Sequence, residues 1–543
     1  MGRGRFRTVV LWLLAVNCPA QIADFAIANA HIYTVDPERA SASAIALKDG
    51  KILALGDDIS RHIGPQTKLV DARGATILPG LIDSHVHMRN LGDSLETLNL
   101  RGAASEAEII ERVRRAVHEH KPGDWIRGRA WDQNLWPDKQ FPTAQGLSQA
   151  APNNPVFLTR VDGHAAWVNQ KALDLADING STPDPHGGKI LRTSSGKPTG
   201  VLIDGAQALA ASKIPNPTPE DNERRIARAA EECVRLGLTT VHDAGVDAAD
   251  IAAYRALISK HQLPVRVYAM LSRSAWNASP TLTPELGDWL TIRAVKLVAD
   301  GALGSRGAAL LQPYSDDPAN SGLLILDEAA IRQVALDAVK RGFQVNTHAI
   351  GDRANRIVLN AYASALKGRN DKRFRVEHAQ IVAPEDFARF RDYSVIASMQ
   401  ATHATSDMPW VESRLGAERL KGAYAWQTFL KLGVHVPNGS DFPVENPNPL
   451  WGIYSAVTRQ DHEGKPPGGW FPDQRMTREQ ALKSWTIEGA YAAFQERTRG
   501  SLSPGKLADL VMLSGDIMQM PAAEIWKTRV TMTVVNGAIV YKE

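Results

Sequence analysis

The alternation of apolar and polar positions divides the chain into two kinds of region. At both ends, short apolar stretches are separated by turn residues, and the C-terminal ones are residues 508–513 and 530–541. Near the N-terminus, Asp49-Gly50 lies between two such stretches and is a dipeptide typical of β-hairpin turns. This pattern predicts one small β-sandwich domain built from both termini, residues 21–79 plus 500–543.

Between these ends the pattern changes to helices that alternate with apolar strands. A helix predicted to begin at Thr218 is followed by a strand over residues 238–242. Further on, a helix begins after Asp327 and is followed by a strand over residues 343–348. Alternating helices and strands are typical of parallel βα units. The predicted fold class is therefore α/β, with a (β/α)8 TIM barrel over residues 80–499.

Residues 101–217 depart from this rhythm. The segment is rich in Trp, Pro and Gly and lacks the regular alternation of barrel units. The barrel region has room for such a segment, because eight βα units need only about 250 residues. We therefore interpret residues 101–217 as an insertion that follows the first barrel strand.

The first twenty residues (1–20) have the pattern of a secretory signal peptide. Three arginines precede an apolar run over residues 9–16, and the small residues up to Ala20 suit cleavage after that position. Lipidation of Cys18 is the alternative, which Asn17 disfavours. The apolar run is too short to span a bilayer. We expect a periplasmic or secreted protein without a membrane segment in its mature form, whose remaining cysteine, Cys233, cannot form an internal disulfide.

Composition and charge narrow the classes of function. Of the 543 residues, 44% are hydrophobic and 22% are charged, as in ordinary soluble globular proteins. A chain of this length is expected to form more than one domain. The formal charge of +3 is small, and no basic cluster with interleaved aromatic residues is present, which argues against nucleic-acid binding. We expect a small molecule as the substrate, and the sequence is compatible with a homodimer.

Candidate chemistry begins in the stretch PGLIDSHVH, where one residue separates His85 from His87. Residues two apart on a β-strand point to the same face, so both imidazoles can reach one metal ion. Imidazole is a preferred ligand of zinc and similar divalent metals. The alternative interpretation is that His85 and His87 are two ordinary polar residues at the end of a strand. The residues found on later strands help to choose between these two interpretations.

Four later strands carry further residues of this kind. They are Lys296, His348, His378 and Asp441. C-terminal strand ends meet at one face of a barrel, where active sites lie. Each histidine taken alone is more often a hydrogen-bonded core residue, and Asp441 follows Asn438-Gly439 and could belong to a turn. Lys296 is harder to explain structurally, because burying a charged lysine costs on the order of several kcal/mol unless it is paired or neutralised.

A known superfamily combines these residues in this order. The chain resembles the amidohydrolase superfamily through the set His85, His87, Lys296, His348, His378 and Asp441. It is similar to the amidohydrolase-3 branch, which includes N-substituted formamide deformylase and the YtcJ-like proteins. Supporting segments include WDQNLWPDKQFPT, RVDGHAAWVNQKAL, VKLVADGALGSRGA, VNTHAIGD, RVEHAQ and NGSDFPVENPNP, and the resemblance covers nearly all of the mature chain.

The resemblance implies a site for two divalent metal ions, with zinc as the expected metal. It implies that His85 and His87 bind the more buried ion and that His348 and His378 bind the second. Lys296, carboxylated on its amine by carbon dioxide, would bridge the two ions. This carboxylation is chemically sensible, because it replaces a buried cation by an anion with two oxygens.

The implied chemistry is hydrolysis by a metal-bound hydroxide. Asp441 would bind metal, take the proton of the hydroxide and pass it to the leaving nitrogen. We expect a hydrolase of carbon–nitrogen bonds other than peptide bonds, in amides or N-acyl compounds. The alternatives are a lactonase, esterase or phosphotriesterase with the same binuclear site, and a non-catalytic regulatory protein on the same scaffold. Lys296 counts against a deaminase, since deaminase sites of this superfamily usually hold one metal and lack the lysine.

Four residues outside this set are candidates for binding the substrate. They are Trp131, Arg160 and His164 in the insertion, and Arg306 on a loop after Lys296. Trp131 could form part of an aromatic wall, and Arg306 could hold a carboxylate or an oxyanion. The alternatives are local packing for Trp131, a structural role for His164 and a solvated loop charge for Arg306.

Overall fold

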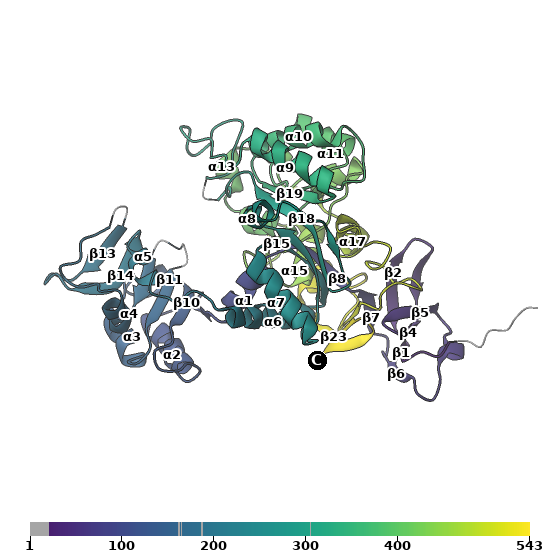
Figure 1. Cartoon of the computed structure of the whole chain (residues 1–543), viewed down its shortest axis with the longest axis horizontal. Coiled ribbons are helices and arrows are strands. Elements are labelled where there is room, and N and C mark those ends of the chain that lie inside the picture. Colours follow the sequence, from purple (N-terminus) through teal and green to yellow (C-terminus); the bar gives the residue numbers. More distant parts are fainter. Residues whose placement is uncertain (1–20, 161–162, 164, 186–187, 305) are drawn as a thin grey trace, which may run out of the picture.

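The computed structural model describes residues 21–160, 163, 165–185, 188–304 and 306–543. The predicted signal peptide, residues 1–20, and His164 lie outside these ranges. Figure 1 shows a central barrel, with an inserted α/β domain on one side and a small β domain on the other. Within the described ranges, no helix combines the length and the apolar character that crossing a membrane requires.

The wall of the barrel is a sheet whose neighbouring main strands are all parallel. In sheet order these strands are β8 (Leu81–Val86), β15 (Leu238–Val246), β16 (Arg266–Leu271), β18 (Leu290–Val298), β19 (Gln344–Ala349), β20 (Arg375–His378) and β21 (Ile396–Ser398). The short β17 (Glu285–Leu286) pairs antiparallel with β18.

Residues 434–441 close the barrel between β21 and β8. Asn438 forms an isolated parallel bridge with Met399, next to β21, and its carbonyl accepts a hydrogen bond from the Ser84 N–H of β8 at 3.0 Å. The sequence predicts a strand here, whereas the structure has an extended segment whose hydrogen bonds are divided among several neighbours. The Asn438 N–H, for example, donates to the Ser484 carbonyl at 2.9 Å. The nearly closed barrel confirms the predicted fold class.

Helices cover the outside of the barrel, and their apolar faces pack on the strands. They are α1 (Met88–Leu95), α6 (Pro219–Arg235), α7 (Ala248–Ser259), α8 (Arg273–Ala278), α9 (Glu328–Arg341), α10 (Asp352–Leu366), α11 (Phe387–Asp392), α12 (Ala401–Asp407), α13 (Val411–Leu415), α14 (Trp426–Lys431), α15 (Pro449–Thr458), α16 (Arg478–Ser484) and α17 (Ile487–Ala492). Two of these helices, α6 and α9, begin where the sequence predicts, because the residue just before each helix caps its N-terminus. Thr218 forms a capping box with Asp221 at α6, and the Asp327 side chain accepts from the Ala330 N–H at α9.

The inserted domain has its own six-stranded sheet. Its order is β13 (Gly188–Arg192), β14 (Pro198–Asp204), β12 (Ala165–Val168), β11 (Val156–Arg160), β10 (Ile126–Trp131) and β9 (Leu98–Asn99). The domain also contains α2 (Glu106–Val117), α3 (Ala144–Ala150), α4 (Gln170–Leu175) and α5 (Gln207–Ala211). In Figure 1 this domain extends away from the barrel next to α1.

Two further sheets lie at the other side of the barrel. One has the order β5 (Lys51–Gly56), β4 (Ala44–Lys48), β1 (Phe25–Ala28) and β6 (Lys68–Asp71). The other has the order β24 (Ala538–Lys542), β23 (Val530–Val535), β22 (Leu510–Leu513), β7 (Thr76–Pro79), β2 (His31–Asp36) and β3 (Arg39–Ala42). β7 pairs antiparallel with β22, so strands from both termini share one sheet. A common apolar core, which includes Ile27, Ile45 and Met532, joins the two sheets.

A buried ion pair joins the barrel to this β domain. The Arg266 guanidinium of β16 donates to both carboxylate oxygens of Asp509, at 2.8 and 3.1 Å. The two side chains are only 1% and 4% exposed. Asp509 also accepts a hydrogen bond from the Asn536 N–H at 2.8 Å, so the carboxylate ties a barrel strand to the turn before β24.

Replacing Asp509 by alanine is expected to lower the free energy of unfolding by about 3–5 kcal/mol, because Arg266 would stay buried without its partner. Urea denaturation measures the change. Glu285→Ala is the matched control, since it removes one partner of the exposed Arg255–Glu285 pair and should cost at most about 1 kcal/mol. Equal losses in the two variants would contradict the role of the buried pair.

Candidate metal centre

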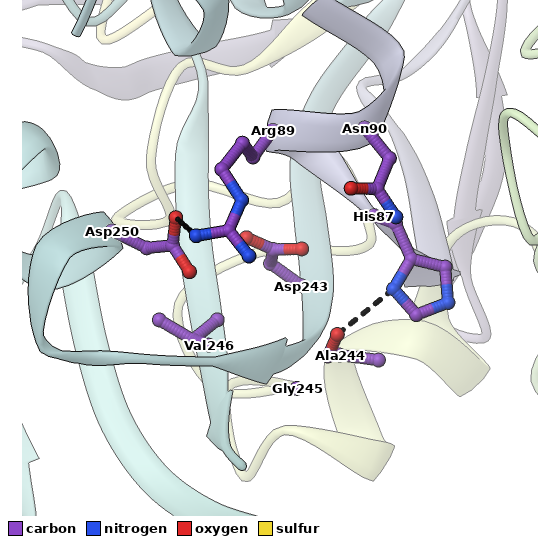
Figure 2. Close-up of a pocket in the computed structure, with 8 residues that line it drawn as sticks. All are labelled: His87, Arg89, Asn90, Asp243, Ala244, Gly245, Val246 and Asp250. Atoms are coloured by element: carbon purple, nitrogen blue, oxygen red, sulfur yellow. Dashed lines mark hydrogen bonds and ion pairs between the residues drawn. The ribbon is translucent and has the colours of Figure 1, made fainter. Parts of the chain in front are cut away.

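His85 and His87 lie at the C-terminal end of β8, the first barrel strand. His85 is fully buried, and its Nδ1 lies 2.6 Å from Glu377 Oε2. The His87 Nδ1 lies 2.9 Å from the Ala244 carbonyl oxygen (Figure 2), and its side chain is 28% exposed. When Nδ1 of a histidine is held by an acceptor, Nε2 is left to bind a metal. Both Nε2 atoms lie near the same carboxylate, which belongs to Asp441.

Asp441 reaches these histidines from the segment that closes the barrel. Its Oδ1 lies 3.2 Å from His87 Nε2 and 3.7 Å from His85 Nε2. Its N–H donates to the His85 carbonyl at 2.8 Å. The backbone of Asp441 has a φ of 57°, and that of His378 a φ of 74°. Such conformations of non-glycine residues are strained and cluster at functional sites.

His348 and His378 lie on neighbouring strands, β19 and β20. Their ring centroids are 4.6 Å apart, and the His378 ring is 4.9 Å from that of His85. The His378 Nδ1 lies 2.7 Å from Gln400 Oε1, which orients the ring. The His348 Nε2 lies 3.5 Å from Asp300 Oδ1 and, although it is buried, forms no hydrogen bond with any residue that the structure describes. The two predicted histidines are therefore adjacent to the first pair.

Lys296 of β18 completes the set of predicted residues. It is 7% exposed, and its Nζ lies 2.9 Å from His85 Nε2. Burial lowers the pKa of this amine, which the nearby carboxylates of Glu377 and Asp441 only partly oppose. All six residues that the sequence analysis proposed as metal ligands thus meet at the C-terminal ends of the barrel strands.

His403 is a functional candidate that the sequence analysis missed. It lies on α12, and its Nε2 is 3.4 Å from Asp441 Oδ2. Its Nδ1 is 3.1 Å from Glu445 Oε1. Strand ends guided the search, whereas His403 lies inside a helix. One signal was available, because α12 directly follows the C-terminal end of β21, where barrel sites lie.

The protonation states of His85, His348, His378 and Asp441 fit metal binding at this centre. His403 differs: burial alone would lower its pKa, but hydrogen bonds to Asp441 and Glu445 raise it to about 10. Burial, followed by the charge of Lys296, lowers the pKa of His348 to about 3, so its imidazole is neutral at ordinary pH. Burial also lowers the pKa of His85 and His378 well below the usual range. Burial alone would raise the pKa of Asp441, but the nearby imidazoles of His403 and His87 lower it well below the usual value. Neutral imidazoles and a carboxylate are the forms that bind divalent cations.

The donor atoms form two groups that share Asp441. Three ligand atoms lie within 4.8 Å of one another in the group His85, His87 and Asp441, and likewise in the group His378, His403 and Asp441. Asp441 Oδ1 and His348 Nε2 are among the buried polar atoms that lack a hydrogen-bond partner within the described residues. Unpaired buried polar atoms are rare in proteins, and a bound ion would satisfy them. The residues present therefore fit divalent cations at this position.

A small polar cavity of about 60 Å³ borders the centre at His87. Figure 2 shows His87 on one side of this cavity and Arg89, Asp243 and Asp250 on the other. The Arg89 guanidinium lies 3.0 Å from Asp250 Oδ1. Because His85 is buried while His87 borders the cavity, the centre has a closed side and an open side.

The candidate substrate residues lie elsewhere. Trp131 is fully buried in the core of the insertion, stacked 6.1 Å from Trp136, with its Nε1–H donating to the Leu158 carbonyl. This arrangement supports the alternative of local packing over the aromatic wall. The Arg160 guanidinium donates to Asp132 at 2.8 Å. Arg306 forms a two-fold contact with Asp316 at 3.0 and 3.1 Å, which favours a loop ion pair over a free binding group.

The chain is similar over most of its length to several known proteins. The chain is 36% identical over 555 residues to Protein LONG AFTER FAR-RED 3 of Arabidopsis thaliana, covering 97% of this chain and 94% of that one. It is 32% identical to YtcJ of Bacillus subtilis (strain 168), with coverages of 94% and 98%. It is 29% identical to N-substituted formamide deformylase of Arthrobacter pascens, with coverages of 96% and 99%.

A solved structure shares the fold. The crystal structure of an uncharacterized metal-dependent hydrolase from Pyrococcus horikoshii OT3 superposes with a TM-score of 0.76 at 29% identity, covering 92% of this chain and 99% of that one. The model of the amidohydrolase family matches residues 68–541 of this chain. That match spans most of the chain and includes every residue of the candidate metal centre, so the protein belongs to the amidohydrolase family.

Proposed function

We propose that the protein is a metal-dependent hydrolase that cleaves carbon–nitrogen bonds of small amides or N-acyl compounds. Membership of the amidohydrolase family supports the hydrolase, and the likeness to an N-substituted formamide deformylase supports the bond type. The observation that carries the proposal is the pair of three-ligand groups that share Asp441 at the mouth of the barrel.

The candidate ligands fall into two sets, each of which would bind one cation. His85, His87 and Asp441 would hold one, and His378, flanked by His348 and His403, would hold the second. Zinc is our proposed metal, because the nitrogen donors are imidazoles. When bound, such cations lower the pKa of water to about 7 and polarise a carbonyl group.

Lys296 would join the two groups as a carbamate. Its pKa is lowered by burial, which favours the neutral amine that reacts with carbon dioxide. In this reaction a nitrogen–carbon bond forms and one proton is released, so a neutral amine becomes an anion. The Nζ lies beside His85 Nε2, where a negative charge would balance that of bound cations.

Asp441 would move the proton during hydrolysis. Its Oδ1 lies 3.2 Å from His87 Nε2 and 3.7 Å from His85 Nε2, and its Oδ2 lies 3.4 Å from His403 Nε2. The carboxylate takes a proton from the attacking water and delivers it to the leaving nitrogen, which otherwise leaves poorly. The hydrogen bond from the Asp441 N–H to the His85 carbonyl, at 2.8 Å, holds the backbone of Asp441 beside the histidines.

Metal analysis tests the proposal directly. Protein purified without its first twenty residues and not stripped of carbon dioxide is expected to contain about two divalent ions per chain. Chelation should abolish hydrolysis of an amide panel, and zinc or manganese should restore it. About one ion per chain would indicate a mononuclear site with unmodified Lys296.

The same preparation separates the competing functions. Lactones and phosphotriesters belong in the substrate panel, because the same centre could cleave them. Preference for either class over amides would reject the proposed bond type. Absence of metal, with no activity gained on adding zinc or manganese, would reject the enzyme and leave a non-catalytic protein on this scaffold.

A further inference from the structure

A second and larger cavity lies between the barrel and the insertion. It has a volume of about 640 Å³ and is lined by α1, by β10 and β11 of the insertion, and by Pro443. Cavities of this size accommodate a drug-sized molecule. The chemistry proposed above does not use this cavity, so its occupant is inferred from the residues that line it.

The described lining of this cavity is strongly cationic. Its charged residues are one carboxylate, Asp93, and four arginines: Arg101, Arg127, Arg129 and Arg160. Arg127 donates to Asp93 at 2.6 Å, and Arg160 is held by Asp132. Arg101 and Arg129 are exposed, and within the described part of the chain their guanidinium groups form no ion pair or hydrogen bond. Two uncompensated positive charges therefore face the cavity.

The backbone of β10 directs two of these side chains to the cavity. Arg127 and Arg129 are two residues apart on the strand, so they share one face of the sheet. The pairing of β10 with β11 shifts register between Arg129 and Trp131, and Ala130 has a φ of 72°. A left-handed alanine costs on the order of 1 kcal/mol, and such strain and such bulges occur where a side chain must be re-aimed at a ligand.

This cavity adjoins the candidate metal centre. Asn90 of α1 lines both the large cavity and the small cavity that His87 also lines (Figure 2). Pro443 lies two residues after Asp441 in the sequence. A molecule held at His87 and Asp441 can therefore extend past Asn90 toward the arginines.

We propose that Arg101 and Arg129 bind an anionic oxygen group, a carboxylate or a phosphate, carried by the substrate at some distance from the bond that is cleaved. The proposal rests on the proposed function and narrows it to acidic small molecules. Guanidinium groups suit this ligand, because their parallel N–H donors match two oxygens of a carboxylate or phosphate.

Chemical protection of the arginines tests the proposal without turnover. The metal-loaded protein is treated with phenylglyoxal, which modifies arginine, and mass spectrometry follows Arg101 and Arg129. The probes are 3-phenylpropionate, 3-phenylpropyl phosphate and the neutral 3-phenylpropan-1-ol. We expect at least one anion at saturation to slow modification of both residues about tenfold, and the alcohol to leave it unchanged. Arg332, exposed on α9, is the internal control.

Each outcome decides one question. Protection by the propionate alone identifies a carboxylate site, and protection by the phosphate alone identifies a phosphate site. Equal protection by the alcohol, or none by either anion, would overturn the proposal. If an anion protects the two arginines but no amide is hydrolysed, the anion site stands and the proposed function is rejected. If amides are hydrolysed but neither anion protects the arginines, the proposed function stands and the anion site is rejected.

Bound metal ions also attract anions, so a pair of variants is needed to distinguish anion binding in this cavity from anion binding at the metal centre. The double variant Arg101→Gln/Arg129→Gln should raise the dissociation constant of the protecting anion about tenfold in a calorimetric titration. Arg332→Gln should leave it unchanged. The guanidinium groups of Arg101 and Arg129 have no ion-pair or hydrogen-bond partner among the described residues, so both variant proteins should melt at the same temperature as the unchanged protein. An unchanged affinity in the double variant would place the anion elsewhere and reject the assignment.

Discussion

Replacing Asp441 by asparagine is expected to lower kcat by about 10²–10⁴-fold, the range that general acid–base catalysis contributes. Asparagine keeps the size of the side chain but cannot accept and return a proton. The fold should survive, since the Asp441 N–H still donates to the His85 carbonyl and the amide oxygen can still accept from His403. Steady-state kinetics on the best amide of the panel measures the loss.

Metal content must be determined on the same Asp441→Asn preparation, because the carboxylate belongs to both ligand groups. Asp473→Asn is the matched control, as this aspartate is exposed and distant in sequence from every candidate ligand. The control should keep full activity and full metal content. If Asp441→Asn turned over at nearly the rate of the unchanged protein, the proton-transfer role would be wrong.

Replacing Lys296 by methionine is expected to reduce metal content from about two ions per chain to one or fewer, with a matching loss of activity. Methionine fills the same buried volume but has no amine to carboxylate. The effect should exceed the 10–100-fold loss of metal affinity that follows removal of an outer hydrogen-bond partner. Equilibrium dialysis against zinc measures the affinity, and ¹³C-NMR of protein prepared in ¹³C-bicarbonate detects a carbamate in the unchanged protein.

Lys340→Met controls for the loss of a lysine, because Lys340 is exposed on α9. It should change neither metal content nor the carbamate signal. Retention of two tightly bound ions by Lys296→Met would refute the bridging role. If the unchanged protein were stable and metal-loaded but gave no carbamate signal, the proposed carboxylation of Lys296 would be refuted.

The sequence predicts those parts of the fold that depend on interactions between residues close together in the chain. The helices α6 and α9 begin at Thr218 and Asp327, because a capping side chain acts on its own first turn. The convergence of His85, Lys296, His348 and the other candidate ligands follows from parallel strands whose ends share one face of a barrel. These inferences need no knowledge of which distant residues meet.

What the sequence does not predict depends on contacts between distant segments. His403 comes close to Asp441 through the folding together of α12 and the closing segment, and its place shortly after β21 is the one local signal that marks it. Arg306 is held by Asp316, a pairing that its loop adopts only when folded. Trp131 is apolar enough for either a core or a binding wall, and its stacking against Trp136 determines which. The roles of the candidate ligands stay predictions until the variants are measured.

The antiparallel pairing of β7 with β22 affects how this protein is made. A ribosome adds about 5–20 residues per second, so β7 emerges well before its partner from the far end of the chain. A sheet of β2, β3 and β7 alone would expose the edge of β7 that pairs with β22 in the complete fold, and such an edge favours association with other chains. Nascent chains that stall before the last strands would therefore depend on chaperones, and the barrel would gain its Arg266–Asp509 anchor only at the end of translation.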